Sequence, residues 1–331
     1  MHRTGLVQDA RFRRHDTGPE HPERPARLEA IERALAAAGL TNRCVPLPIR
    51  PATAEEIHRI HQPEYVERLS RACRDGEPFI DVPDSAICPE SYDVALLAAG
   101  AVVEATDAVM AGRIDNAFCS VRPPGHHAMA DRSMGFCLLN NVAIAAEHLI
   151  RRHGLERVLI VDWDVHHANG TQASFESRPE VMVISLHGHP SWVYPGTSGF
   201  ASETGLADGE GFTINLPMFP GSGEAEYRRA FVEKVLPAMG WYQPQFVLVS
   251  AGFDAHRADP LAPILLEDES FDRMTRHVMN IASRYAWGRL VSVLEGGYDL
   301  EAMGRCVVSH VAHLLDYAPE TEGLRHKSGI W

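Results

Sequence analysis

The stretch Arg157–Thr171 reads RVLIVDWDVHHANGT, and it indicates both a fold and a site. Its first five residues, an arginine followed by four apolar residues, have the length and composition of a strand that is buried on both faces. Two carboxylates and two imidazoles follow directly where such a strand would end. Comparable apolar runs, separated by helical patterns, occur at 117–121, 181–186, 246–250 and 290–294. This alternation predicts an α/β protein with a parallel sheet and helices on both of its faces.

Helical periodicity fills the gaps between these runs. Asn140 is a suitable N-cap for one helix, and Gly154 stands where that helix would end. No repeat, low-complexity tract or flexible linker divides the sequence, so we expect a single domain over residues 1–331. Further helices are expected over residues 25–38, 91–110, 225–239 and 268–285.

The composition argues against some classes of function. The 331 residues contain 31 Lys and Arg and 44 Asp and Glu, a formal net charge of −13, and no long basic block occurs. Direct binding to nucleic acid is therefore not expected. An acidic surface would attract cationic substrates such as lysine-rich tails or polyamines, although acidity that serves only solubility is an alternative. The longest apolar run, Val94–Val103, is too short to cross a bilayer, so no membrane contact is expected.

The six cysteines are scattered at positions 44, 73, 88, 119, 137 and 306, and no C-x-x-C pair occurs. This spacing indicates neither a disulfide framework nor a structural zinc knuckle. The N-terminal residues MHRTGLVQDARFRRHD lack the apolar segment of a signal peptide. We therefore expect a reduced, cytoplasmic setting.

Polar residues follow all five predicted strands. In parallel α/β sheets ligands bind outside the carboxyl ends of the strands, so these residues should converge on one site. The segments are Arg122–His127, Asp162–His167, Ser185–His189, Gly252–Asp254 and Glu295–Tyr298.

Three of these residues form a candidate metal site. If the chain stays extended after Val161, Asp164 and His166 point to the same side. Asp254 would supply the third ligand, leaving a coordination position open for water, as in catalytic zinc sites. Ferrous iron or another divalent ion also accepts such ligands. An Asp that caps a helix beside a buried His is the alternative for the D-x-H motif alone.

The remaining chemistry falls to two histidines and a tyrosine. His126 and His127 follow two prolines, and histidine can remove a proton from water and protonate a leaving amine near neutral pH. Tyr298 follows two glycines that allow a tight backbone path, so its hydroxyl could donate to an oxyanion. Histidines that pack in a loop or bind metal, and a tyrosine that only packs, are the alternatives.

Taken together, these motifs resemble the histone deacetylase superfamily in its class II-like branch. The resemblance extends from residue 15 to about residue 300. The motifs that carry it are HDTGPEHPERPARLEAI (15–31), RPPGHHA (122–128), GFC (135–137), NN (140–141), VDWDVHHANGT (161–171), SLH (185–187), YPGT (194–197), AGFDAH (251–256) and LEGGY (294–298).

The resemblance implies the arginase/deacetylase fold, in which one eight-stranded parallel sheet lies between layers of helices. It implies one Zn²⁺ per chain, held by Asp164, His166 and Asp254, with Tyr298 as the oxyanion donor. His127 becomes the general base and also the acid that protonates the amine.

The same resemblance implies roles for residues around this centre. His126 would support the transition state electrostatically, with Asp162 orienting His126 and Asn169 holding His127. The acyl-lysine tunnel, the inner pocket, the substrate rim and a monovalent-cation site for K⁺ are implied as well. The tunnel residues are Gly135, Phe136, Tyr194 and Leu261; the inner pocket has Arg27 and Cys137; the rim acid is Asp84; the cation site uses main-chain oxygens around Asp162, Asp164, His166, Ser185 and Leu186.

Substrate choice rests on one position. Leu261 stands where polyamine-selective relatives carry a glutamate, which favours acyl-lysine in proteins or peptides, acetyl-lysine first, over acetylpolyamines. Bacterial members often break this rule, so an acetylpolyamine amidohydrolase is the main alternative. A binuclear arginase-type hydrolase is disfavoured because Ala168 and His256 replace the further acids. A non-catalytic acyl-lysine binder is disfavoured because Tyr298 is present. Homo-oligomer formation is left open.

Overall fold

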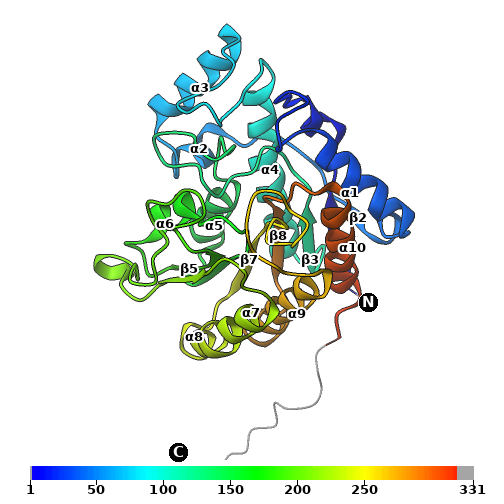
Figure 1. The fold of residues 1–331 in the computed structure, drawn as a ribbon, viewed down its shortest axis with the longest axis vertical. Coiled ribbons are helices and arrows are strands. Elements are labelled where there is room, and N and C mark those ends of the chain that lie inside the picture. The colour runs from blue at the N-terminus through cyan, green and yellow to red at the C-terminus, as the bar shows by residue number, and fades with distance from the viewer. Residues whose placement is uncertain (1, 319–331) are drawn as a thin grey trace, which may run out of the picture.

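The computed structural model describes residues 2–318 of the chain (Figure 1). Within these residues eight strands form one sheet in the order β2-β1-β3-β8-β7-β4-β5-β6, and every neighbouring pair is parallel. The strands are β1 (Thr4–Val7), β2 (Val45–Pro46), β3 (Asn116–Cys119), β4 (Val158–Asp162), β5 (Val181–Gly188), β6 (Thr213–Met218), β7 (Phe246–Ala251) and β8 (Leu290–Leu294). The predicted α/β class and the eight-stranded parallel sheet are thus confirmed.

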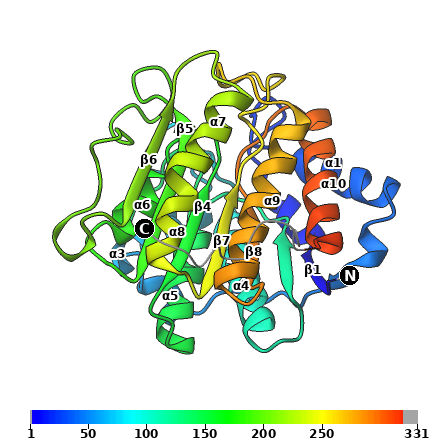
Figure 2. The ribbon, with the colours of Figure 1, turned by 90° about the horizontal axis from the view of Figure 1, so that it is seen from below.

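Helices cover both faces of the sheet, and Figure 2 shows the two layers with the strands between them. One layer contains α1 (Ala26–Ala37), α7 (Glu224–Ala230), α8 (Leu236–Tyr242), α9 (Asp268–Tyr285) and α10 (Leu300–Asp316). The opposite side carries α2 (Ala54–His58), α3 (Pro63–Asp75), α4 (Ser91–Met110), α5 (Asn141–His153) and α6 (Asn169–Phe175). Short 3₁₀ turns lie at Ala10–Arg14, Thr41–Arg43 and Ala207–Gly209, and a π-helical turn lies at Phe231–Val235.

The central strands are buried along their whole length, which explains their unbroken apolar sequence. All residues of β3, β4, β7 and β8 are buried, since helices cover the sheet on both sides. Polar side chains therefore occur mainly where these strands end. At those positions they can form a site without placing polar groups in the apolar core. No helix within residues 2–318 is long and apolar enough to span a bilayer.

The structure confirms the five strands marked by apolar runs, with shifts of one or two residues at their ends. The helices predicted at 91–110 and 268–285 have those bounds, and Asn140 caps α5 by accepting from the Ala143 amide. The remaining strands, β1, β2 and β6, have no long apolar run, and β2 and β6 contain proline. The runs alone therefore predicted only the middle of the sheet and β5.

One predicted helix differs from the structure. The expected helix at 225–239 is α7, a π-helical turn and α8 in succession, and it extends to Tyr242. Pro237 lies in the first turn of α8 and has no amide hydrogen to donate to a carbonyl of the preceding turn. The widened π turn comes directly before this proline, where such a break is expected.

Candidate active site

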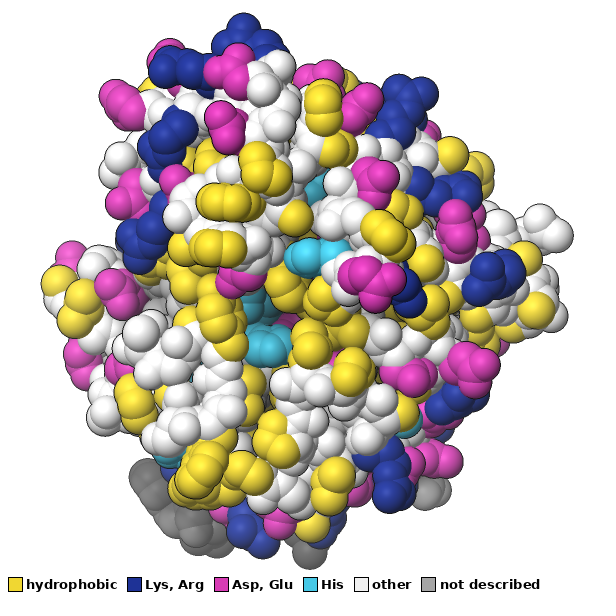
Figure 3. All heavy atoms as spheres, turned by 45° about the horizontal axis from the view of Figure 1, so that its top comes forward, with side chains coloured by type: hydrophobic (Ala, Val, Ile, Leu, Met, Phe, Trp, Pro, Cys, Tyr) yellow, Lys and Arg dark blue, Asp and Glu magenta, His cyan; other side chains and the backbone are white. Residues whose placement is uncertain are grey.

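The polar segments that follow the central strands meet in a hollow of the surface. Figure 3 shows histidine side chains at the floor of this hollow and hydrophobic side chains around its edge. The convergence predicted from the strand ends is therefore present. Ser185 and His187 differ from the prediction in one respect, because β5 continues to Gly188 and they lie within the strand.

Asp164, His166 and Asp254 form the centre of the site. The Nδ1 atom of His166 lies 3.0 Å from an Asp164 oxygen and 3.1 Å from an Asp254 oxygen, and all three residues are buried. One nitrogen and two carboxylate oxygens thus converge closely enough to share an ion. This donor set, with room for an exchangeable ligand, fits a catalytic zinc.

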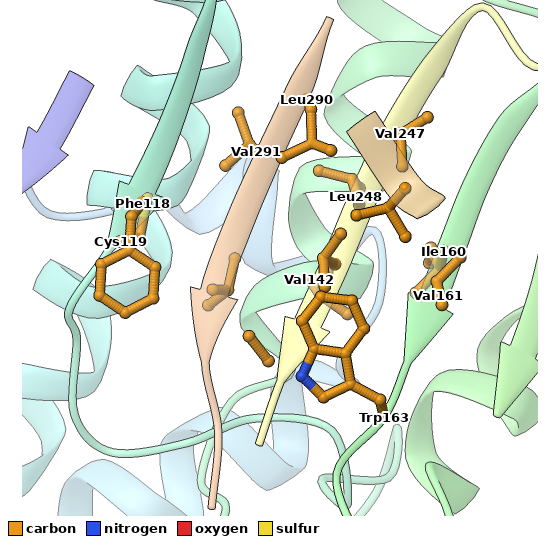
Figure 4. Close-up of a cluster of buried hydrophobic side chains, with 14 of the residues drawn as sticks. Phe118, Cys119, Val142, Ile160, Val161, Trp163, Val247, Leu248, Leu290 and Val291 are labelled. Carbon is orange, nitrogen blue, oxygen red and sulfur yellow. The ribbon is translucent and has the colours of Figure 1, made fainter. Parts of the chain in front are cut away.

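The segment between β4 and α6 reaches this arrangement by bending, which corrects the extended path assumed from the sequence. Residues 164–166 form a bend in which the His166 amide donates to Asp164 over 2.9 Å. Trp163 is fully buried, and Figure 4 shows it just beyond the end of β4, beside side chains of the core. The indole anchors the chain at the point where the two ligands begin.

Two glycines leave the space that the carboxylates occupy. A Cβ atom on Gly296 would lie 2.1 Å from an Asp254 oxygen, and one on Gly252 would lie 2.3 Å from an Asp164 oxygen. The Gly296 amide also donates to Asp164 over 2.7 Å, and the Val165 amide donates to Asp254 over 2.8 Å. Backbone amides thus fix both oxygens of Asp164 and one oxygen of Asp254.

The electrostatics of this cluster favour a cation between the carboxylates. Burial raises the pKa of Asp254, and the charge of Asp164 raises it further. Although burial opposes protonation, hydrogen bonds to both carboxylates raise the pKa of His166 to about 10. A divalent ion would supply positive charge to the same oxygens and release the imidazole nitrogen for ligation.

His126 and His127 lie side by side next to this centre, with ring centroids 4.0 Å apart. The Nδ1 atom of His126 lies 3.0 Å from Asp162, and the Nδ1 atom of His127 lies 2.6 Å from the side-chain oxygen of Asn169. The structure therefore brings together both pairs that the resemblance implied. Each partner orients its imidazole and leaves the Nε2 atom free of that contact.

The two histidines have opposite electrostatic environments. Burial lowers the pKa of His127, and the neighbouring His126 lowers it further. Although burial also opposes protonation of His126, the carboxylates of Asp164 and Asp162 raise its pKa. The pKa values of the two adjacent imidazoles are thus shifted in opposite directions. Such a pair suits a site in which His126 holds a proton and His127 accepts one.

Glu295 positions this pair, and sequence reasoning did not assign it a role. Its buried carboxylate accepts from the amides of Gly125 (2.7 Å) and His126 (3.2 Å), and burial raises its pKa to about 7. It also accepts from the Ser250 hydroxyl. The sequence contained one signal for this role, an acidic residue directly after an apolar strand. A carboxylate that is buried there needs several hydrogen-bond donors.

Tyr298 is half-buried between Phe136 and Arg27. Its ring is 5.9 Å from that of Phe136 at an interplanar angle of 83°, and the Arg27 guanidinium lies 5.0 Å from its centroid. Asp259, a second residue that the sequence reasoning missed, accepts from the Tyr298 amide over 2.7 Å. Burial raises the pKa of the Tyr298 phenol, so its proton stays in place at neutral pH.

Aromatic side chains border the approach to the histidines. Tyr194 packs against His127 edge to face at 5.1 Å, and Gly135 lies between them with no room for a Cβ atom. Phe136 has φ 68°, a conformation that few side chains adopt without support from their surroundings. Leu261 is 40% exposed, and its amide donates to Asp259, the residue that holds the Tyr298 backbone. Gly135, Phe136 and Tyr194 thus pack beside His127 or Tyr298, whereas Leu261 is linked to Tyr298 through Asp259.

The residues implied for the inner pocket lie behind this centre. Arg27 is fully buried, donates to the backbone oxygens of Gly297 and Glu295, and forms an ion pair with Glu23. Cys137 is buried beside His126 and Glu295. The guanidinium is thus held against the segment that carries Tyr298.

The implied rim acid and cation site have less distinctive surroundings. Asp84 lies near the Tyr194 phenol and raises the pKa of that group, second to burial. For the cation site, β4 and β5 pair Asp162 with Ser185, which brings the two implied segments to neighbouring positions, and Leu186 follows in β5. Asp164 and His166 follow β4 directly.

Comparison with known proteins gives consistent matches over most of the chain. The sequence pattern of the family described as histone deacetylase domain matches residues 21–314. The histone deacetylase-like amidohydrolase of Pseudomonas aeruginosa is 42% identical over 294 residues, 89% of this chain and 77% of that protein. The probable deacetylase of Archaeoglobus fulgidus is 40% identical over 300 residues, 90% of this chain and 82% of that protein.

A human relative and a solved structure extend these matches. The polyamine deacetylase HDAC10 of Homo sapiens is 40% identical over 311 residues, 91% of this chain and 46% of that longer protein. The crystal structure of the HDA15 HD domain superposes with a TM-score of 0.90 at 38% identity, covering 97% of this chain and 92% of that chain.

Proposed function

The chain belongs to the histone deacetylase family, and from that premise we propose that it is a zinc-dependent deacylase that hydrolyses N-acyl-lysine in proteins or peptides, acetyl-lysine first. The family and its amidohydrolase members support a hydrolase. The observation that carries the proposal is the meeting of Asp164, His166 and Asp254 beside the paired imidazoles. We further propose that residues 1–331 act as a single catalytic domain, which the single sheet supports.

We propose that Asp164, His166 and Asp254 hold one zinc ion. When bound, zinc supplies Lewis-acid polarisation of the amide carbonyl and acidifies a water molecule. The two carboxylates are fixed by backbone amides, so the protein presents a preformed ligand set. Ala168 offers no ligand atom for a second ion beside the first, which argues against the binuclear arginase-type alternative.

His127 is the proposed general base. Its Nδ1 atom donates to the Asn169 oxygen, so its Nε2 atom carries the lone pair that can take a proton from the attacking water. The same nitrogen can later return that proton to the departing amine. His126, held by Asp162, keeps its proton on Nδ1 and supplies positive charge beside the reacting carbonyl.

Tyr298 is the proposed donor to the developing oxyanion. Because burial raises the pKa of the phenol, its hydroxyl keeps the proton that it must donate. The Asp259 carboxylate holds the Tyr298 backbone from one side, and the Arg27 guanidinium packs on the ring from the other. These contacts limit the orientations available to the phenol.

Phe136 and Tyr194 are the proposed walls that guide the acyl-lysine side chain and exclude water. Arg27 and Cys137 would receive the released carboxylate product in the inner pocket. Asp84 at the rim would contact the substrate backbone. The main-chain oxygens around Asp162, Asp164, His166, Ser185 and Leu186 would hold K⁺ near the strand ends, a proposal that the β4–β5 register supports.

Two substrate classes compete for this tunnel. The relative named polyamine deacetylase is 40% identical to this chain, which favours acetylpolyamines as a second candidate. Leu261 at the opening favours acyl-lysine peptides, since its side chain offers no negative charge to a second ammonium group of a polyamine. We therefore place acyl-lysine first.

A turnover panel tests this proposal. Purified protein is assayed on acetyl-, propionyl- and longer acyl-lysine peptides and on acetylputrescine and acetylspermidine, with and without a chelator. We expect the highest kcat/KM on an acyl-lysine peptide and its loss on chelation, restored by zinc. Higher kcat/KM on the acetylpolyamines would favour the second candidate. A zinc-loaded protein that turns over no substrate would contradict catalysis and favour a binding protein.

A further inference from the structure

A second cluster of metal-ligating side chains lies between α4 and α5, outside the catalytic centre. The carboxylate oxygen Oδ1 of Asp107 is 2.8 Å from Nε2 of His148 and 2.6 Å from Nε2 of His153. The three ligand atoms lie within 4.8 Å of one another. Two imidazoles and one carboxylate thus converge on a single point, with no part assigned to them in the proposed reaction.

The helices themselves produce this convergence. Asp107 lies near the end of α4, while His148 and His153 lie in the last two turns of α5, which packs along α4. Gly154, with φ 67°, ends α5 directly after the second histidine. The imidazole rings are 5.5 Å apart with an interplanar angle of 71°, so both nitrogens reach the carboxylate from different directions.

The charge of Asp107 is available to a cation. The Asp107 side chain is partly exposed, and its Oδ1 atom contacts both imidazoles. Within residues 2–318 its ion pairs are with these two histidines only. Arg113 and Arg152 line the adjacent surface hollow of about 420 Å³, but both side chains are exposed, so solvent screens their charge.

A further observation comes from the other nitrogen of His148. Its Nδ1 atom is buried and has no hydrogen-bond partner in the described part of the chain, but it lies 3.8 Å from a carboxylate oxygen of Glu56. When a metal binds one imidazole nitrogen, the other nitrogen carries a hydrogen and commonly donates it to a carboxylate. Metal on Nε2 would therefore give the unpaired Nδ1 a hydrogen directed at Glu56.

We propose that Asp107, His148 and His153 bind a divalent transition-metal ion, in a site that is separate from the catalytic centre and joins α4 to α5. The ligands are Oδ1 of Asp107 and the two Nε2 atoms, and water from the adjacent hollow completes the coordination. Imidazole nitrogens select zinc and similar ions over calcium or magnesium. The site does not depend on the proposed deacylase function.

A third cluster shows why these ligands are favoured. His256, Asp268 and Cys306 also lie within reach of one another, but the Asp268 carboxylate is paired with Arg305 over 2.7 Å. Burial also raises the pKa of the Cys306 thiol, which opposes the thiolate that a metal requires. The guanidinium thus takes the position that a cation would need.

Metal counting with matched variants tests the proposal. Zinc-loaded wild-type protein is dialysed against metal-free buffer and analysed for zinc per chain. We expect about two ions in the wild type and about one in Asp107→Asn and in His153→Ala, because losing a ligand should weaken the second ion by more than about 100-fold. His313→Ala is the control, since His313 contacts a carboxylate, Asp272, without a second imidazole. It should retain two ions.

A complementary variant identifies which ion is lost. Asp254→Asn should lose the catalytic ion and turnover but keep the second ion, whereas His153→Ala should keep turnover within about twofold. Thermal unfolding followed by circular dichroism provides a readout that is independent of activity. Added zinc should raise the Tm of Asp254→Asn and not that of the double variant Asp254→Asn/His153→Ala.

Two results would overturn the proposal: a single ion in the wild type, or a second ion that persists in both Asp107→Asn and His153→Ala. Should either of these variants fail to fold, Glu56→Gln keeps an acceptor for the Thr53 amide and removes the charge beside His148, together with the charge that pairs with Arg50. It should weaken the second ion by about 10- to 100-fold. Unchanged affinity in Glu56→Gln would likewise contradict the site.

Discussion

The two candidate metal sites use the same side-chain types in different surroundings. At the strand ends, Asp164 and Asp254 are buried and receive backbone hydrogen bonds, and glycines leave space for them. Between α4 and α5, the Asp107 side chain is 30% exposed, and within residues 2–318 it receives hydrogen bonds only from the two histidines. The first site is thus fixed by the backbone, and the second by its own side chains.

This difference separates catalysis from binding. Catalysis needs groups held in one geometry before the substrate arrives, because reorganisation during the reaction costs rate. The strand-end site has that support, and the residues proposed as base, acid and oxyanion donor surround it. Among the residues that the structure describes, no comparable set of groups surrounds the helix-pair site, so we expect it to bind an ion without catalysing a reaction. We therefore ask first whether backbone support is what holds the strand-end ligands in place for metal binding and turnover.

The largest effect is expected from Gly296→Ala. The added Cβ would lie 2.1 Å from Asp254 and 2.6 Å from Asp164, so the carboxylates must move apart. We expect metal affinity to fall by more than about 100-fold and turnover to be lost with it. Gly240→Ala is the matched control, because no atom lies within 4 Å of its added Cβ. Elemental analysis and kcat/KM check both; a metallated, active Gly296→Ala enzyme would refute the role of the backbone.

Tyr298→Phe should lower turnover by about 10²- to 10³-fold and leave the metal content unchanged, since only the oxyanion donor is removed. Tyr227→Phe is a useful control, because the buried Tyr227 hydroxyl has no hydrogen-bond partner in the described chain. It should keep near-normal turnover. Steady-state kinetics combined with zinc analysis measures both effects, and normal turnover in Tyr298→Phe would exclude the proposed role.

His61 tests the support of α5, the helix that carries His148 and His153. The His61 Nε2 atom accepts from the amide of Asn140, the N-cap of α5, and burial lowers the pKa of His61 to about 4. Because this folded-state pKa lies below the unfolded value of about 6.5, the stabilisation is present above pH 6.5 and is lost as the pH falls toward 4. From about pH 7.5 to pH 5 the loss should be about 2 kcal/mol.

Chemical denaturation at these two pH values measures that loss. His61→Gln keeps a neutral amide at the position, so its free energy of unfolding should depend less on pH by about the same amount. The other buried histidines, such as His15 and His310, keep their own contributions in the variant. Equal pH dependence in wild type and variant would show that His61 is not held neutral by the fold.

The smallest expected effect concerns the opening of the tunnel. Leu261→Glu places a carboxylate at a half-exposed position, where it can attract a second ammonium group of an acetylpolyamine. We expect the kcat/KM ratio of acetylspermidine to acetyl-lysine peptide to rise by about twofold to fivefold. Leu261→Gln, which has similar size and no charge, should leave the ratio near that of the wild type. A ratio that rises equally in both variants would rule out charge as the cause.

The sequence predicted the middle of the sheet because its strands are buried on both faces and therefore apolar throughout. It also predicted that Asp164, His166 and Asp254 would meet, since parallel strands bring their carboxyl ends to one edge. Glu295 and Asp259 were not predicted, because their roles are hydrogen bonds to the backbone of residues far away in sequence. Asp107 and His148 were missed for a related reason. Asp107 and His148 come close because α4 packs on α5, and the sequence of either helix alone does not predict that packing.

The most direct test of the account is a crystal structure of the zinc-loaded protein with anomalous diffraction measured on both sides of the zinc absorption edge. The account predicts an anomalous peak bound by Asp164, His166 and Asp254, with His127 and Tyr298 facing it. A map without a peak among these three residues, from protein that is active and contains zinc, would contradict it.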